Sequence, residues 1–160
     1  MTTIESISAV KLNSHITIQQ TPKGRGVFVT KKFAQGETVV VGIPIEEVPE
    51  RTIYSIQINF NCHVKLDEPA IFINHSCDPN TGVKNNQFGG YDFVPLGDIE
   101  AGEEISWDYE TTEYESIAVR SCLCESLSCR AKTLGFKFRE QMLRDTYGEY
   151  IADYLKTKSK

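Results

Sequence analysis

Four of the five cysteines in this 160-residue chain lie in two separate places, and their spacing constrains how the chain can fold. Three of them form a C-x-C-x4-C run, Cys122, Cys124 and Cys129, and the fourth, Cys77, lies in the middle of the chain. A structural zinc ion takes four ligands in a tetrahedron, so this run leaves such an ion one ligand short. Cys77 is the best available fourth ligand. We therefore predict one closed zinc site that ties the C-terminal arm to the middle of the chain.

The fifth cysteine, Cys62, has two interpretations: a small buried hydrophobic residue, or a residue with a metal or redox role. The first residues lack the basic and apolar regions of a secretory signal, so we expect an intracellular protein, in which clustered cysteines hold metal more often than they form disulfides. His15 and His63 are alternative zinc ligands, although isolated histidines are more often surface or core residues. C-x-C lacks the C-x-x-C spacing of dithiol oxidoreductases, which disfavours a redox pair.

Length and composition predict one globular domain, with 40% apolar and 24% charged residues. No apolar run approaches the roughly 18 residues that span a membrane, so no membrane association is expected. The net charge of −5 argues against direct nucleic-acid binding, which favours a basic surface.

The acidic residues are unevenly distributed. Eight carboxylates and no lysine or arginine stand in one stretch, at Asp98, Glu100, Glu103, Glu104, Asp108, Glu110, Glu113 and Glu115. One interpretation is a local negative field that attracts a basic peptide. The other is a solvated loop that keeps the protein soluble.

Short extended segments separated by glycine turns dominate the first two thirds of the chain. Predicted strands occupy residues 16–19, 27–30, 38–41, 54–60, 62–66, 91–94 and 105–107. In the 54–60 segment the alternation places Tyr54, Ile56, Ile58 and Phe60 on one buried face. The links between strands are too short for βαβ crossovers, so the sequence predicts a mainly β fold of small sheets.

The pattern becomes helical beyond Cys129. The apolar residues spaced for one helix face are Phe136, Leu143, Tyr147, Tyr150, Ile151, Tyr154 and Leu155. Gly148 is expected to weaken or break this helix. We predict a C-terminal helix whose aromatic stripe packs in the core.

Four motifs occur in order: Lys23-Gly24-Arg25-Gly26-Val27-Phe28, Phe72-Ile73-Asn74-His75-Ser76-Cys77-Asp78-Pro79-Asn80, Gly102-Glu103-Glu104-Ile105-Ser106-Trp107-Asp108-Tyr109, and the C-x-C-x4-C run. Together they resemble the SET-domain family of protein lysine methyltransferases, with its post-SET zinc motif. The resemblance implies a SET-domain, β-clip type fold of three small sheets with a pseudoknot. It also implies four regions: residues 1–15 as an N-terminal segment, 16–112 as the SET domain, 113–135 as the post-SET zinc arm and 136–160 as a C-terminal helical extension.

The resemblance assigns roles to single residues. Tyr109 is the implied catalytic residue, which orients the substrate amine through its hydroxyl. S-adenosylmethionine is the implied cofactor, and its implied contacts are Lys23, Gly24, Arg25, Gly26, Asn74, His75 and Leu134. The implied substrate channel contains Trp107, Tyr54 and Phe136. The resemblance also makes the zinc ion at Cys77, Cys122, Cys124 and Cys129 structural.

Two of these positions depart from the family pattern. Trp107 stands where the family usually carries phenylalanine or tyrosine, a position associated with the number of methyl groups added, so the product state stays open. Tyr54 is only a loose counterpart of the family's Tyr-x-Gly element. For Phe136, helix packing is an alternative to a place over the cofactor or the channel.

The implied activity is S-adenosylmethionine-dependent methylation of lysine in a basic protein or peptide, such as a histone tail. The alternative is a catalytically silent SET-like module that binds a peptide or another partner. The presence of both Asn74 and Tyr109 favours the enzyme. The expected location is the nucleus, on chromatin, in a eukaryote, or the cytoplasm in a bacterium. The target lysine and the oligomeric state stay open.

Overall fold

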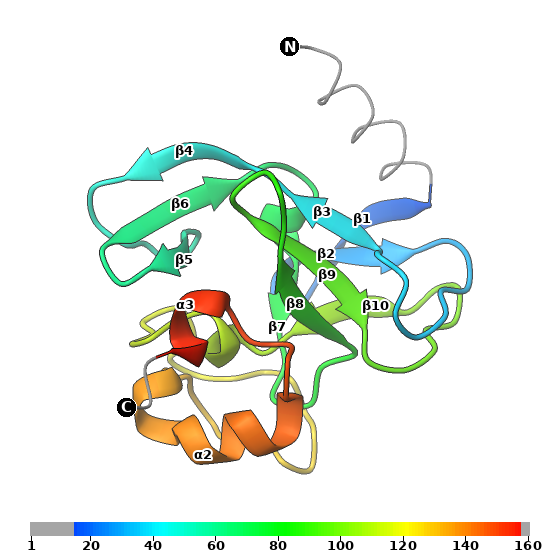
Figure 1. Ribbon diagram of the computed structural model, residues 1–160. Helices are drawn as coiled ribbons and strands as arrows, with labels where there is room; N and C mark the ends of the chain where they lie inside the picture. The colour runs from blue at the N-terminus through cyan, green and yellow to red at the C-terminus, as the bar shows by residue number, and fades with distance from the viewer. Residues whose placement is uncertain (1–14, 158–160) are drawn as a thin grey trace.

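A computed structural model describes residues 15–157, so the predicted N-terminal segment lies outside the described residues except for its last residue. Short strands account for most of the regular structure (Figure 1). The strands are β1 (Ile16–Thr21), β2 (Gly24–Val29), β3 (Val40–Gly42), β4 (Pro44–Val48), β5 (Ile56–Asn59), β6 (Cys62–Leu66), β7 (Asn74–His75), β8 (Thr81–Asn85), β9 (Tyr91–Pro95) and β10 (Glu104–Trp107). The helices are the 3₁₀ turns η1 (Ala70–Phe72) and η2 (Tyr109–Thr111), then α2 (Phe136–Tyr147) and α3 (Asp153–Lys156).

The strands form three small sheets, as the sequence predicts. Their orders are β1-β2-β10-β7, β3-β9-β8 and β4-β6-β5. Buried residues from all three sheets form one core, among them Val27 and Ile105 of the first sheet, Val40 of the second and Val64 of the third. The Tyr91 hydroxyl donates to the carbonyl of Gln57 at 2.7 Å, which satisfies a polar group inside this core.

The pairing of β10 decides where the site forms. β10 is antiparallel to β2 and parallel to β7, with Trp107 opposite His75. Asn80 holds this arrangement, because its side chain donates to the Glu104 carbonyl and accepts from the Ser106 N–H, both at 2.9 Å. A parallel pair needs a long connection, so two motifs that are distant in sequence become neighbours.

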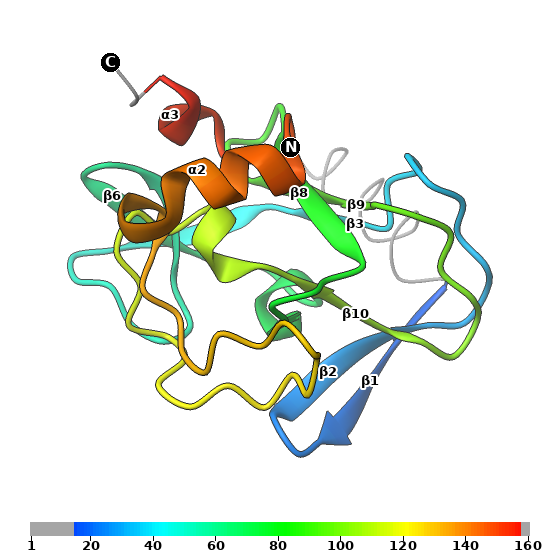
Figure 2. The same ribbon diagram turned by 90° about the horizontal axis from the view of Figure 1, so that it is seen from below.

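The C-terminal part of the chain packs beside η2. Figure 1 shows α2 and α3 together below the sheets, and Figure 2 shows the arm before α2 as a long loop. α2 ends at Tyr147, and Gly148 caps it with a φ of 57°, in the left-handed region, so the predicted break is confirmed. Leu143 and Tyr147 bury the helix against the core. Within residues 15–157, no helix has the length and apolar character that crossing a membrane requires.

Three strands were not predicted from the sequence, and a fourth segment was predicted with the wrong bounds. β4, β7 and β8 are short or polar, so their alternation is weak. The predicted 54–60 strand is reduced to β5, and Tyr54 lies before it with 65% of its surface exposed. Gln57, which was expected on the exposed face, is buried. Its side-chain amide can be buried because it donates to the Asn59 carbonyl and accepts from the Tyr114 N–H.

The approach to α2 requires a glycine at residue 135. Gly135 has a φ of 124°, and a Cβ there would lie 2.3 Å from the carbonyl oxygen of Tyr114. We expect Gly135→Ala to lower the free energy of unfolding by about 1–3 kcal/mol, measured by urea denaturation. Gly97→Ala is the matched control, because a Cβ at Gly97 meets nothing within 4 Å. Equal losses in the two variants would contradict this reading.

Candidate functional site

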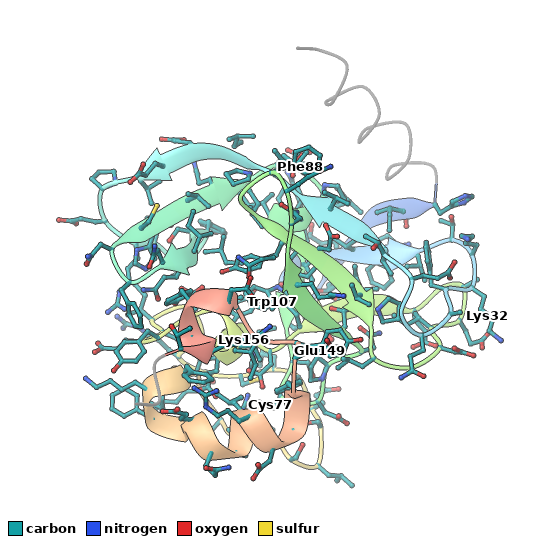
Figure 3. The ribbon with its side chains drawn as sticks, in the orientation of Figure 1. Lys32, Cys77, Phe88, Trp107, Glu149 and Lys156 are labelled. Atoms are coloured by element: carbon teal, nitrogen blue, oxygen red, sulfur yellow. The ribbon has the colours of Figure 1, made fainter. Side chains whose placement is uncertain are left out.

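A cavity of about 540 Å³ lies where the predicted motifs meet. Figure 3 shows Trp107, one of its lining residues, near the middle of the molecule. The lining comes from the turn before β2, the loop before β5, the segment from η1 to β7, the end of β10 and the C-terminal arm, at residues 23–25, 51–56, 66, 70–75, 93, 107, 109, 113 and 116–123. The arm therefore forms one wall of the cavity.

Asn74 joins the glycine turn to the rest of the site. Its amide donates to the Arg25 carbonyl at 2.9 Å and to the Glu104 carboxylate at 3.0 Å. Lys23 lies 3.3 Å from the same carboxylate. Gly26 leaves room for it, since a Cβ at Gly26 would lie 2.5 Å from a Glu104 oxygen. One connected wall of the cavity is thus formed by Asn74, Lys23 and Arg25. Gly26 does not line the cavity, and its contribution is the space that it leaves for the Glu104 carboxylate.

Tyr109 points into the protein. Its hydroxyl donates to the Ile73 carbonyl at 3.0 Å, and its ring centroid lies 4.5 Å from that of Trp107. Burial raises the pKa of the Tyr109 phenol, so the group stays a neutral hydrogen-bond donor across the physiological range. The Tyr109 side chain lines the cavity rather than facing solvent, and its catalytic role stays a prediction.

His75 links Tyr109 to Cys77. Its Nδ1 accepts the Tyr109 backbone N–H at 3.0 Å, and its Nε2 lies 3.5 Å from the Cys77 sulfur. Burial lowers the pKa of His75 to about 3, so the ring is neutral. A neutral imidazole that accepts at Nδ1 carries its proton on Nε2, and this N–H points at the sulfur. The ring therefore fixes both the Tyr109 backbone and Cys77.

The four predicted zinc ligands come together. The sulfur atoms of Cys77, Cys122, Cys124 and Cys129 all lie within 4.8 Å of one another, and those of Cys77 and Cys122 are 3.9 Å apart. Tetrahedral zinc with bonds of about 2.3 Å separates its sulfurs by about 3.8 Å, so the set fits a closed structural zinc site. Of the described residues, Cys62, His15 and His63 are not members of this group. Cys62 instead packs against the core as a small hydrophobic residue.

A buried ion network next to Tyr109 was not predicted. Asp108 and Glu110 are almost fully buried, and Arg130 reaches them at 2.6 Å and 3.1 Å. The Tyr147 hydroxyl donates to Asp108 at 2.8 Å, and Arg139 lies 3.4 Å from Glu110. The sequence contained only an indirect indication of this network, namely that Arg130 directly follows a predicted zinc ligand and that both carboxylates flank Tyr109. The network joins the arm and α2 to the end of β10.

The acidic stretch is therefore not one exposed field. Asp108, Glu110 and Glu113 are buried. Lys32 lies 3.7 Å from both Asp98 and Glu100, which are exposed. Neither sequence-based interpretation covers the buried members, because both assumed that the whole stretch faces solvent.

Besides Gly26, two residues predicted to contact the cofactor or to line the channel lie outside the cavity lining. Leu134 donates its backbone N–H to Glu110 at 2.6 Å, and the fully buried Phe136 begins α2. Neither is in the cavity lining, because the arm has already crossed the cavity at residues 116–123. For Phe136 the structure favours the helix-packing alternative. Tyr54 does line the cavity, although it is exposed and outside a strand.

The zinc site makes a direct prediction. Purified protein should contain about one zinc per chain by elemental analysis, and Cys129→Ser should lower that content because only three thiolates remain. Cys62→Ser is the control and should keep its zinc, since Cys62 lies outside the sulfur group. Full zinc occupancy in Cys129→Ser would contradict the assignment.

The ion network makes a second prediction. Arg130→Met leaves two buried carboxylates without their shared cation, so we expect a loss of about 3–5 kcal/mol in the free energy of unfolding. Lys32→Met breaks only exposed pairs and should cost less than about 1 kcal/mol. Chemical denaturation of both variants measures the difference, and comparable losses would show that the Arg130 pairs contribute no more than surface pairs.

Several proteins named as methyltransferases are similar in sequence to this chain. Histone-lysine N-methyltransferase Set2 of Drosophila melanogaster is 40% identical over 62 residues, which are 37% of this chain and 3% of that protein. Methyltransferase flvH of Aspergillus flavus is 22% identical over 143 residues, which are 86% of this chain and 76% of that protein. The chain thus spans only a small part of Set2, and 5% of the histone-lysine N-methyltransferase met-2 of Caenorhabditis elegans.

Two crystal structures of KRYPTONITE share the fold. One contains mCHG DNA and SAH; it has a TM-score of 0.60 and 22% identity, and covers 76% of this chain and 29% of that chain. The other contains mCHH DNA, an H3(1-15) peptide and SAH, with a TM-score of 0.58 and 21% identity over 73% of this chain and 29% of that chain. The family model described as SET domain matches residues 24–110, more than half of the chain. The chain therefore belongs to the SET-domain family.

Proposed function

We propose that the protein is an S-adenosylmethionine-dependent protein-lysine N-methyltransferase. The observation that supports this most is the single cavity that joins the Lys23–Arg25 turn and Asn74 to Tyr109. Relatives in the family are histone-lysine N-methyltransferases, and the KRYPTONITE structures contain SAH. When bound, S-adenosylmethionine supplies a methyl group on a positively charged sulfur. Gly24 lines the cavity, and nothing lies within 4 Å of where a Cβ would stand there, so the turn leaves its backbone uncovered for such a ligand.

The residues around Tyr109 fit the needs of methyl transfer to an amine. The rings of Phe93, Trp107 and Tyr109 follow one another at centroid distances of 5.7 Å and 4.5 Å, which makes an aromatic wall of the cavity. Lysine must react as a neutral amine, although its ordinary pKa is about 10.4, and apolar burial lowers that value. The Tyr109 hydroxyl can orient the amine, and alignment of the reacting groups can supply about 7–11 kcal/mol.

We further propose that the substrate is a basic protein or peptide such as a histone. The relatives' names support a histone, and one KRYPTONITE structure contains an H3 peptide. Exposed apolar side chains of the cavity lining offer a platform for the substrate backbone, at Ile53, Tyr54, Ile117 and Leu123. The intracellular location stays a prediction.

Tyr109→Phe tests the catalytic assignment. With labelled S-adenosylmethionine and core histones, we expect wild-type protein to label lysine and Tyr109→Phe to lose about 10²–10³-fold in rate, because a positioned hydroxyl is removed. Tyr150→Phe is the control, since Tyr150 lies outside the cavity lining. Unchanged labelling by Tyr109→Phe would contradict the role. Failure to label any protein while the cofactor still binds would support the silent-module alternative.

A further inference from the structure

Glu113 is the one carboxylate among the described residues that line the cavity. The other charged residues of the lining are cations, at Lys23, Arg25, Arg51 and Arg120. Only 7% of the Glu113 surface is exposed. A buried carboxylate at the wall of a binding cavity is costly unless it is matched by hydrogen bonds or by a cation.

The Glu113 side chain is held in one position close to Tyr109. The backbone N–H of Glu113 donates to the Tyr109 carbonyl at 3.0 Å, so Glu113 lies one helical turn beyond Tyr109 in the chain. The Gln57 N–H and the Thr112 hydroxyl each donate to Oε2 at 2.9 Å. Both hydrogen bonds that the carboxyl accepts from described residues therefore end on the same oxygen. Oε1 is the oxygen left for a group in the cavity.

The surroundings of Glu113 contain little that can neutralise its charge. Burial raises the pKa of the carboxyl to about 7, while its two hydrogen bonds and Arg51 act in the opposite direction. Three phenols lie close enough to interact with the Glu113 charge, at Tyr91, Tyr109 and Tyr154. Burial first of all, and this charge in addition, raise the pKa of each phenol, so all three stay neutral. Arg51 is partly committed elsewhere, because it donates to the Glu115 carbonyl at 2.7 Å.

We propose that Glu113 is the residue that binds the protonated amine of the substrate as it enters the cavity, before the amine loses its proton for methyl transfer, with Oε1 accepting an ammonium N–H. The inference rests on the function proposed above, in which this cavity receives a lysine side chain. An ammonium group loses its water shell when it enters an aromatic channel, and a charge-assisted hydrogen bond offsets part of that loss. A purely structural residue at this position needs only an oxygen for Gln57 and Thr112, which a neutral glutamine also provides.

Trp107 makes the proposal testable without any methyl transfer. It is the only tryptophan of the chain and lines the same cavity, so its fluorescence reports ligands that enter. The probes are n-butylamine, which is a protonated mimic of the lysine side chain, and n-butanol as its neutral counterpart. At about pH 8.5 the wild type should bind the ammonium at least about tenfold more tightly than the alcohol, a difference of about 1.4 kcal/mol.

Glu113→Gln should remove this preference while it keeps an acceptor for Gln57 and Thr112. Glu115→Gln is the matched control and should retain the preference, because Glu115 pairs with Lys137 at 3.0 Å and does not line the cavity. If Glu113→Gln does not fold, the wild type alone decides. Its preference should fall by about tenfold between about pH 8.5 and about pH 5.5, because Glu113 becomes protonated while the alkylammonium does not.

An unchanged preference in Glu113→Gln, a preference that does not depend on pH, or no binding of n-butylamine to the wild type would each overturn the inference. These outcomes concern binding only. They are therefore separate from a failure of the proposed function, which would appear as an absence of methyl transfer in a protein that still prefers the ammonium.

Discussion

Two attachments hold the C-terminal arm across the cavity, and both start from residues next to the site. Cys77 follows the β7 segment and meets the three cysteines of the arm, while Asp108 follows β10 and meets Arg130. Arg130 also donates its backbone N–H to the Cys77 sulfur at 3.3 Å, so the two attachments are joined. Because β7 and β10 are paired, whatever holds the arm also fixes the wall that carries His75 and Tyr109. The arm, the four-cysteine group and the cavity wall are thus connected by direct contacts.

The chemistry of the cavity follows from what is neutral and what is charged within it. His75 and Tyr109 are kept neutral by burial, and they contribute hydrogen bonds rather than charge. Aromatic rings form the wall around Tyr109. Glu113 stands out as the buried carboxyl of this lining. A site of this kind suits a reaction that depends on alignment and exclusion of water more than on acid or base catalysis.

The sequence predicted the parts of the structure that are written in local patterns or in ligand chemistry. The sulfur group was predictable because zinc needs four ligands and the spacing leaves few choices. Glycine turns and alternating segments predicted most strands, and Gly148 predicted the end of α2. The burial of Asp108 and Glu110 was not predictable from charge counting, since their partner Arg130 is distant in sequence. Leu134 was expected at the cofactor but lies outside the cavity lining, and the path of the irregular arm that carries it has no periodic signal. For Phe136 the helical pattern did offer the packing position that it takes in α2.

The most direct test of this account is the affinity for S-adenosylmethionine, measured by calorimetry on zinc-containing protein and on protein stripped of metal by a chelator. Residues 116–123 of the arm line the cavity, so we expect metal removal to release this wall and to weaken binding strongly. Restoring zinc should restore the affinity. Equal affinity with and without the metal would contradict the claim that the arm completes the site.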